Sequence, residues 1–324
     1  MPYPTVKPRV PGPLATAGVY ADLDALVRLQ FQARGFSFLP HQPVHSLLAG
    51  RHASRLRGRG LNFEEIRRYL PGDDIRTMDW HITARTRKPH IRVYTEERDR
   101  PVLLVVDQRL PMFFGSQRAM KSVVAAEAAA LAAWRALASG DRVGALVFDD
   151  RDIVEITPQR SRRQVMRLLQ AVVEKNHALR VDAPIQPRPV ILHGVLEQAT
   201  RLAKHDYLVC LISDGAGADQ DTVRLITLLS AHNDVLMLFI YDPLEAQLPD
   251  AGRLIVAEGA LQLEVNTSDR GLRQRYDAEF AHWLGRIREL SQQREIPVLP
   301  LSTARGVVEQ VREVLGHQPL ARRV

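Results

Sequence analysis

From residue 101 onward, short apolar runs alternate with segments of helical periodicity. Residues 102–106 are a continuous apolar run, as expected of a strand covered on both faces, and an Ala-rich helix follows at 117–139. The same pattern predicts strands at 143–148, 153–156, 207–212, 234–241 and 296–301, an irregular strand-like stretch at 252–265, and helices at 161–175, 189–204, 219–231, 270–292 and 304–315. Such alternation predicts an α/β fold, doubly wound around one mainly parallel sheet, in which 102–107 and 207–212 are parallel neighbours. Ligands or partners of such folds bind at the carboxyl ends of the strands.

The rest of the chain is additional to this main domain. We expect an extended Pro/Gly-rich arm at 1–18, a helix plus a small appendage of short strands and turns within 19–99, the main domain at 100–316 and a tail at 317–324. The longest apolar run is too short and too polar to span a membrane, and the N-terminus lacks the apolar core of a signal peptide. We therefore expect a cytoplasmic protein without a membrane span. The single cysteine, Cys210, excludes an internal disulfide and a cysteine-based zinc cage.

Residues 58–85 combine a tight turn with many pairable charges. Pro and Gly followed by two Asp residues form turn chemistry, and planar Arg donors alternate with carboxylates around it. Trp80 is expected to be an apolar anchor. The members of this Arg/Asp motif are Arg68, Pro71, Gly72, Asp73, Asp74, Arg76, Asp79, Trp80 and Arg85. The favoured interpretation is a structural clamp that fastens the segment to the main domain; the alternative is a surface that recognises a partner. A catalytic role is disfavoured, because the stretch has no Cys or activated Ser and its lone His81 has no evident orienting partner.

The ungapped pattern Arg-x-x-Pro-Gly-Asp-Asp-x-Arg-x-x-Asp-Trp-x-x-x-Ala-Arg from residue 68 to 85 resembles the bacterial domain-of-unknown-function family fifty-eight. Members of that family carry a von Willebrand factor A-like domain and are typically encoded beside MoxR-type AAA+ ATPases. The resemblance implies a non-enzymatic protein-interaction module that works with such an ATPase in the assembly, maturation or stress handling of client proteins. Many relatives carry two N-terminal transmembrane helices, which this sequence does not predict.

The resemblance also implies a place for a metal-ion-dependent adhesion site, which holds Mg²⁺ through Asp-x-Ser-x-Ser after the first strand, a Thr from a second loop and an Asp from a third. Here the first loop carries Asp107, with Arg109 and Pro111 in place of the two serines, and the third carries Ser213 and Asp214. The second loop, at 183–190, supplies no Thr. Since Mg²⁺ demands near-octahedral oxygen ligation, we expect no metal and no other cofactor. Arg109 is expected to pair with Asp107 or Asp214; a weak Mg²⁺ site completed by water or a partner is the alternative.

Two other classes of function stay open. A metal-dependent hydrolase or nuclease using Asp107, Asp149 and Asp214 requires these carboxylates to converge, whereas the adjacent Asp149 and Asp150 are more typical of a turn. No nucleotide-binding glycine loop or Gly-x-Ser-x-Gly nucleophile elbow is present. The net charge of +7 suggests a nucleic-acid binder, but aromatic residues make up only 6% and no known nucleic-acid module is present, which disfavours that class.

Overall fold

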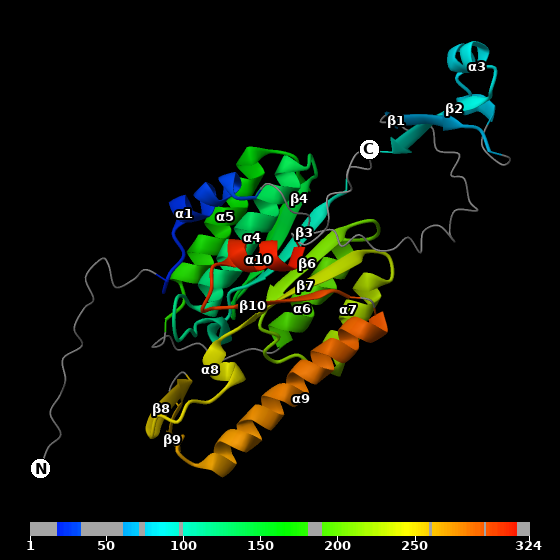
Figure 1. Ribbon diagram of the computed structural model, residues 1–324. Coiled ribbons are helices and arrows are strands. Elements are labelled where there is room, and N and C mark those ends of the chain that lie inside the picture. Colours follow the sequence, from blue (N-terminus) through cyan, green and yellow to red (C-terminus); the bar gives the residue numbers. More distant parts are fainter. Residues whose placement is uncertain are drawn as a thin grey trace, which may run out of the picture. The chain divides into compact units, whose positions relative to one another are not determined.

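The computed structural model describes residues 18–33, 61–70, 75–96, 100–180, 190–258, 261–294 and 296–315. The chain divides into two compact units, one formed by residues 1–40 and 100–324 and the other by residues 41–99. The first unit is the α/β domain shown with its labelled helices and strands in Figure 1. Residues 1–17 of the arm expected at 1–18 and the whole tail expected at 317–324 lie outside the described residues.

Six strands form the central sheet of the α/β domain. They lie in the order β10-β7-β6-β3-β4-β5, where β3 is Val102–Asp107, β4 Val143–Phe148, β5 Ile153–Gln159, β6 Leu208–Ser213, β7 Asp234–Tyr241 and β10 Val298–Ser302. All neighbours are parallel except β5, which runs antiparallel to β4 at one edge. Counted along the chain, this is the 3-2-1-4-5-6 order of doubly wound folds. The predicted fold class is confirmed, as is the parallel pairing of β3 with β6, in which Val102 lies opposite Leu208.

Helices cover both faces of the sheet because the strands are apolar on both faces. Helices α1 (Leu23–Arg28), α4 (Lys121–Ala138), α5 (Arg162–His177) and α10 (Val307–Leu315) share one apolar cluster with the sheet, while α6 (Val190–Leu202) and α7 (Gln220–Ser230) share the other (Figure 1). Along β3 the side chains alternate between the clusters, Leu104 on the α4 side and Leu103 on the α6 side. Helix α4 is Ala-rich and almost wholly buried, which places it as the central helix of its layer.

The first helix belongs to the α/β domain and not to the appendage. Helix α1 continues into a short 3-10 helix, η1 (Leu29–Phe31), and Leu26 is only 2% exposed. The Trp134 Nε1–H of α4 donates to the Leu26 carbonyl at 3.0 Å, which fixes α1 on the domain. The appendage expected over 19–99 is therefore divided, and only its later part forms the second unit.

The segment after β7 is more regular than the sequence suggested. A short helix α8 (Pro243–Ala246) precedes an antiparallel hairpin of β8 (Arg253–Glu258) and β9 (Leu261–Asn266), and the long helix α9 (Arg270–Arg294) follows. The stretch expected to be irregular pairs Leu254 with Val265 and Val256 with Leu263, so one face of the hairpin is apolar. Among the described helices, none is both long enough and apolar enough to cross a membrane.

The second unit holds the Arg/Asp motif on a hairpin of β1 (Leu61–Arg68) and β2 (His90–Glu96), with η2 (Ile75–Thr77) and helix α3 (Trp80–Thr86). The prediction of only strands and turns here was wrong, because Asp79 caps a helix: its Oδ1 accepts the Ile82 amide at 3.0 Å. Trp80, which was expected to be an apolar anchor, is 66% exposed.

Candidate functional site

The loops that follow β3 and β6 lie side by side at one edge of the sheet, because these strands are parallel neighbours. This arrangement brings Asp107, Ser213 and Asp214 to the same edge, as the sequence predicted from the strand pattern. Pro111 lies in a short 3-10 helix, η3 (Leu110–Met112), within the first loop. The second loop, at 183–189, lies outside the described residues.

Arg109 and Asp107 form a fully buried ion pair. The Arg109 Nη2 is 2.6 Å from Asp107 Oδ2, and its Nε is 3.0 Å from Oδ1; the side chains are 3% and 0% exposed. The Ser213 hydroxyl also donates to Asp107 Oδ2, at 2.7 Å. Arg109 Nη2 donates further to the Ala216 carbonyl at 3.0 Å, so that the guanidinium connects the first and third loops. Both oxygens of Asp107 are thus occupied by protein donors.

The surrounding carboxylates keep the Arg109 guanidinium charged. Burial alone would lower the pKa of Arg109, but the neighbouring Asp107, with smaller contributions from Asp214 and Asp150, raises it above its usual value. A permanent cation therefore neutralises the Asp107 carboxylate that a bound metal would otherwise neutralise.

Asp214 is paired with a different cation, Lys121, the first residue of α4. The Lys121 Nζ is 2.7 Å from Asp214 Oδ2 and 2.5 Å from Oε1 of Glu245 on α8. Lys121 is 4% exposed, and burial alone would lower its pKa, but Asp214 and Glu245 raise it. The sequence interpretation missed both Lys121 and Glu245, because neither belongs to a motif.

Asp149 bonds to a different set of groups from Asp107 and Asp214. It forms the predicted turn, accepting the amides of Arg151 and Asp152 at 2.9 and 3.0 Å, and it pairs with Lys175 at 3.1 Å. Burial alone would raise the pKa of Asp149, but these amides and the Lys175 ammonium lower it. Asp107, Asp149 and Asp214 therefore each have their own cation. Within the described ranges, no three His, Cys, Asp or Glu side chains form a group that could hold a metal ion.

Neighbouring polar contacts hold the loops in place. Buried Asp150 accepts the Leu110 amide at 2.6 Å, which fixes the first loop against the β4–β5 turn. The Gln108 amide group donates to the Ser122 carbonyl and accepts from Asn176, both at 3.0 Å. These hydrogen bonds hold the loop after β3 against the neighbouring elements.

A cavity of about 440 Å³ opens beside the Lys121 cluster; we call it the edge cavity. Its walls come from α4, the loop after β6, the end of β7, α8 and α9. They comprise Lys121, Asp214, Gly215, Ala216, Gly217, Ala218, Ile240, Glu245, Tyr276 and Phe280. Gly215 and Gly217 have φ values of 71° and 77°, a backbone conformation that glycine adopts without strain. A volume of this size lies within the range of roughly 300–1,000 Å³ that is typical of ligand pockets.

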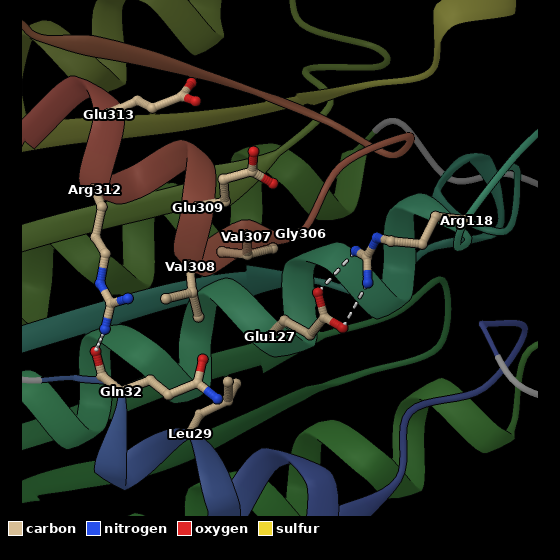
Figure 2. A pocket seen from close by; sticks show the side chains of 10 residues that line it. All are labelled: Leu29, Gln32, Arg118, Glu127, Gly306, Val307, Val308, Glu309, Arg312 and Glu313. Atoms are coloured by element: carbon tan, nitrogen blue, oxygen red, sulfur yellow. Dashed lines mark hydrogen bonds and ion pairs between the residues drawn. The ribbon is translucent and has the colours of Figure 1, made fainter.

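A larger and more open hollow, about 730 Å³, lies between η1, α4 and α10 (Figure 2). Several of its charged side chains form hydrogen bonds with other residues of its wall. Arg118 makes two bonds to Glu127, at 3.0 and 2.8 Å, and Arg312 donates to the Gln32 carbonyl at 3.2 Å. These contacts connect the elements around the hollow. It is separate from the loops that carry Asp107 and Asp214.

The structure places the Arg/Asp motif on the second unit. Arg68, Arg76 and Arg85 are exposed, at the end of β1, in η2 and in α3 respectively, whereas Asp79 is buried beneath the start of α3. Pro71, Gly72, Asp73 and Asp74 lie outside the described residues.

Comparison with known proteins places the chain in a family. The model of the family described as "Protein of unknown function DUF58" matches residues 65–283, which covers both the motif and the α/β domain up to α9. The chain belongs to this family. The resemblance inferred from residues 68–85 is thereby confirmed.

Relatives and solved structures were also found. The uncharacterized proteins Mb1516 of Mycobacterium bovis and MT1527 and Rv1480 of Mycobacterium tuberculosis are each 30% identical over 221 residues, covering 67% of this chain and 66% of theirs. The chain thus matches slightly less than two thirds of these relatives' length. Similar solved structures are BatB from Bacteroides thetaiotaomicron (13% identity, TM-score 0.39, 66% of this chain and 98% of that one) and the SpRpn10 VWA domain (11%, 0.35, 69% and 98%).

Proposed function

We propose that this protein is a non-enzymatic protein-interaction module whose binding surface is the edge of the sheet that carries Asp107, Asp214 and the edge cavity. The observation that carries this proposal is the pairing of Asp107, Asp149 and Asp214 each with a buried cation. Such pairs hold loops in fixed positions, and the three paired carboxylates are then poorly suited to act as a free general acid, general base or nucleophile. The position supports the same view, because doubly wound folds bind their ligands at the carboxyl ends of the strands.

The proposed partner is a MoxR-type AAA+ ATPase, with client proteins that are assembled, matured or handled under stress. This part of the proposal depends on the family resemblance alone. The cytoplasmic location expected from the sequence belongs to the same proposal. So does the metal-free state of the site, which is supported by Arg109 and Ser213 occupying the oxygens of Asp107.

The test is a pull-down from the native organism with the tagged protein, followed by identification of any AAA+ ATPase that co-purifies. Phe114 is suited to a loss-of-binding variant, because it is 40% exposed and its ring centroid is 5.9 Å from the Lys121 ammonium. Phe114→Ser should reduce recovery of the ATPase. Leu228→Ser is the matched control, since Leu228 is an apolar residue on α7 that is 51% exposed. Failure to recover an AAA+ ATPase with the wild-type protein would contradict the proposed partner.

The Arg/Asp motif is a second candidate for recognition. Large apolar side chains are exposed next to it, with Leu70 at 59%, Ile75 at 60% and Trp80 at 66%. Exposed apolar groups around a family motif are more typical of a binding surface than of a purely structural clamp. Trp80→Ser in the same pull-down tests this: recovery equal to that of the wild type would favour the clamp, and loss of the ATPase with an unchanged Tm would favour recognition.

A further inference from the structure

The edge cavity has an excess of negative charge. One ammonium group, Lys121, faces two carboxylates, Asp214 and Glu245, which leaves a formal charge of −1. Glu245 is the more accessible carboxylate, at 28% exposed compared with 6% for Asp214. Its other oxygen accepts the Asp242 amide at 2.9 Å, which fixes the carboxylate in the cavity wall.

A further carboxylate behind the wall adds to this excess. Asp242 is 0% exposed, and its carboxylate accepts hydrogen bonds from neutral groups: the hydroxyls of Ser116 and Thr303 and the backbone amides of Ser116 and Leu244. Neutral donors stabilise a carboxylate without cancelling its charge. The pKa of Tyr276, which lines the cavity from α9, is raised, first by burial and then by Glu245, with Asp277 and Asp242 adding to the effect and Lys121 opposing it. Around the cavity, the three carboxylates of Asp214, Glu245 and Asp242 therefore outnumber the one ammonium group of Lys121.

The same cavity has an aromatic wall. Tyr276 and Phe280 both come from α9, and Tyr276 is 37% exposed. Aromatic faces attract cations, and the planar guanidinium of arginine also stacks on them while donating hydrogen bonds at its edge. A lining that combines carboxylates with aromatic rings is thus complementary to a guanidinium group.

We propose that the edge cavity binds the guanidinium group of an arginine side chain on a partner protein. The Glu245 carboxylate would accept its hydrogen bonds, and the rings of Tyr276 and Phe280 would contact its face. A partner carboxylate, the group that completes a metal-ion-dependent adhesion site, would be repelled here. This inference rests on the proposed function, because it names the chemistry by which that surface would recognise its partner.

The probe is a capped pentapeptide, acetyl-Gly-Ser-Arg-Ser-Gly-amide, titrated into the intact protein. Matched peptides carry lysine, citrulline or glutamate at the central position. The backbone amide NMR signals of Gly215 and Gly217 report on the cavity directly, since both residues line it. The arginine peptide should shift them saturably, the lysine peptide should bind more weakly, and citrulline, which is nearly isosteric but neutral, should bind at least fivefold more weakly. Equal binding of arginine and citrulline, or tighter binding of the glutamate peptide, would overturn the proposal.

Variants locate the binding. Glu245→Gln keeps an oxygen for the Asp242 amide but removes the charge, and should weaken the arginine peptide at least threefold. Tyr276→Leu should weaken it as well, whereas Tyr276→Phe, which keeps the ring, should not. Glu309→Gln on α10 is the control, because this exposed glutamate lines the other hollow. Unchanged amide spectra away from the cavity would show that each variant is folded, and wild-type affinity in Glu245→Gln would refute the assignment.

Two results separate this inference from the proposed function. If the arginine peptide does not bind but Phe114→Ser still releases the ATPase, the interaction surface stands and the arginine assignment is wrong. If the arginine peptide binds but no ATPase is recovered, the cavity chemistry stands and the proposed partner is wrong. Titration with Mg²⁺ alone is the remaining arm: saturable shifts of Gly215 and Gly217 that compete with the peptide would make the cavity a metal site instead.

Discussion

Removing the Arg109 guanidinium should destabilise the α/β domain severely, because Asp107 would then be a buried carboxylate without a counter-charge. In Arg109→Ala, Asp107 loses every contact with the guanidinium, and it retains the Ser213 hydroxyl at 2.7 Å and the backbone amide of residue 109 at 3.0 Å. The third loop also loses the bond between Arg109 and the Ala216 carbonyl.

The magnitude follows from the burial of the pair. Breaking a buried ion pair by removing one partner costs about 3–5 kcal/mol. The two donors that remain on Asp107, and the space that the missing side chain opens to water, favour the lower end of this range, about 3 kcal/mol. For a domain of about 150–250 residues this corresponds to a Tm lower by roughly 6–12 °C.

The assay is urea unfolding of the wild type, Arg109→Ala, Asp107→Asn and the double variant. The double variant should lose clearly less free energy of unfolding than the sum of the two single variants, because each single variant leaves one polar partner buried alone. If the free energy of unfolding of Arg109→Ala is within about 0.5 kcal/mol of the wild-type value, as for surface substitutions, Arg109 is not the counter-charge that stabilises Asp107. A saturable Mg²⁺-induced rise in the wild-type Tm that Asp107→Ala abolishes would also refute it, since it would make the site a working metal site.

Three further predictions concern the framework of the fold. Gly144→Ala should lower the free energy of unfolding in urea by about 1–3 kcal/mol, because a Cβ there would stand 2.5 Å from a backbone oxygen of β5. Gly194→Ala in α6 should instead raise it by about 0.5–1 kcal/mol, because a Cβ there would meet nothing within 4 Å. Equal effects of the two substitutions would contradict the packing. The carboxyl of Asp219, which caps α7, should titrate by NMR with a pKa of about 2, lowered first by the Thr222 amide and then by His193. Because this pKa is below the reference value of 3.8, the carboxylate stabilises the fold above pH 3.8, and this stabilisation is lost as the pH falls through 2. His193→Ala should raise the pKa of Asp219. Asp79→Ala should cost the second unit about 1 kcal/mol and speed amide exchange in α3, and unchanged exchange there would mean that the cap is dispensable.

The sequence predicted the sheet well because its strands are continuous apolar runs that only a two-sided core accommodates. β3, β4 and β7 begin and end within one residue of the predicted bounds. Helix α3 was missed, because its seven residues, about two turns, are too few to show the apolar periodicity by which helices are detected in sequence. The hairpin of β8 and β9 was predicted only as strand-like, since its alternation is visible only when the register of the two strands is known.

In the candidate site, contacts between residues close in sequence could be predicted, whereas contacts between residues far apart in sequence could not. Arg109 and Asp107 are two residues apart in one loop, so their pairing is accessible from the residue types alone. Lys121 meets Asp214 across 93 residues and Glu245 across 124, and only the fold brings these three together. Nothing in the composition of an Ala-rich helix marks its first lysine as a buried cation. The edge cavity was invisible for the same reason, because its walls come from five separate elements.

If side-chain cations stand where a metal would, as we propose, the edge recognises a partner in a different way. A bound Mg²⁺ with an open coordination position attracts a carboxylate, since the ion carries more charge than its shell has neutralised. Arg109 and Lys121 have no such surplus, because each is buried against at least one carboxylate and Lys121 faces two. The excess charge around Lys121 is therefore negative, and Glu245 is the more accessible of its two carboxylate partners. An attraction of this kind is carried by protein charges alone, so it should weaken with ionic strength and be insensitive to chelators. Under this proposal the edge presents a negative charge to a partner, where an edge with a bound Mg²⁺ would present a positive one.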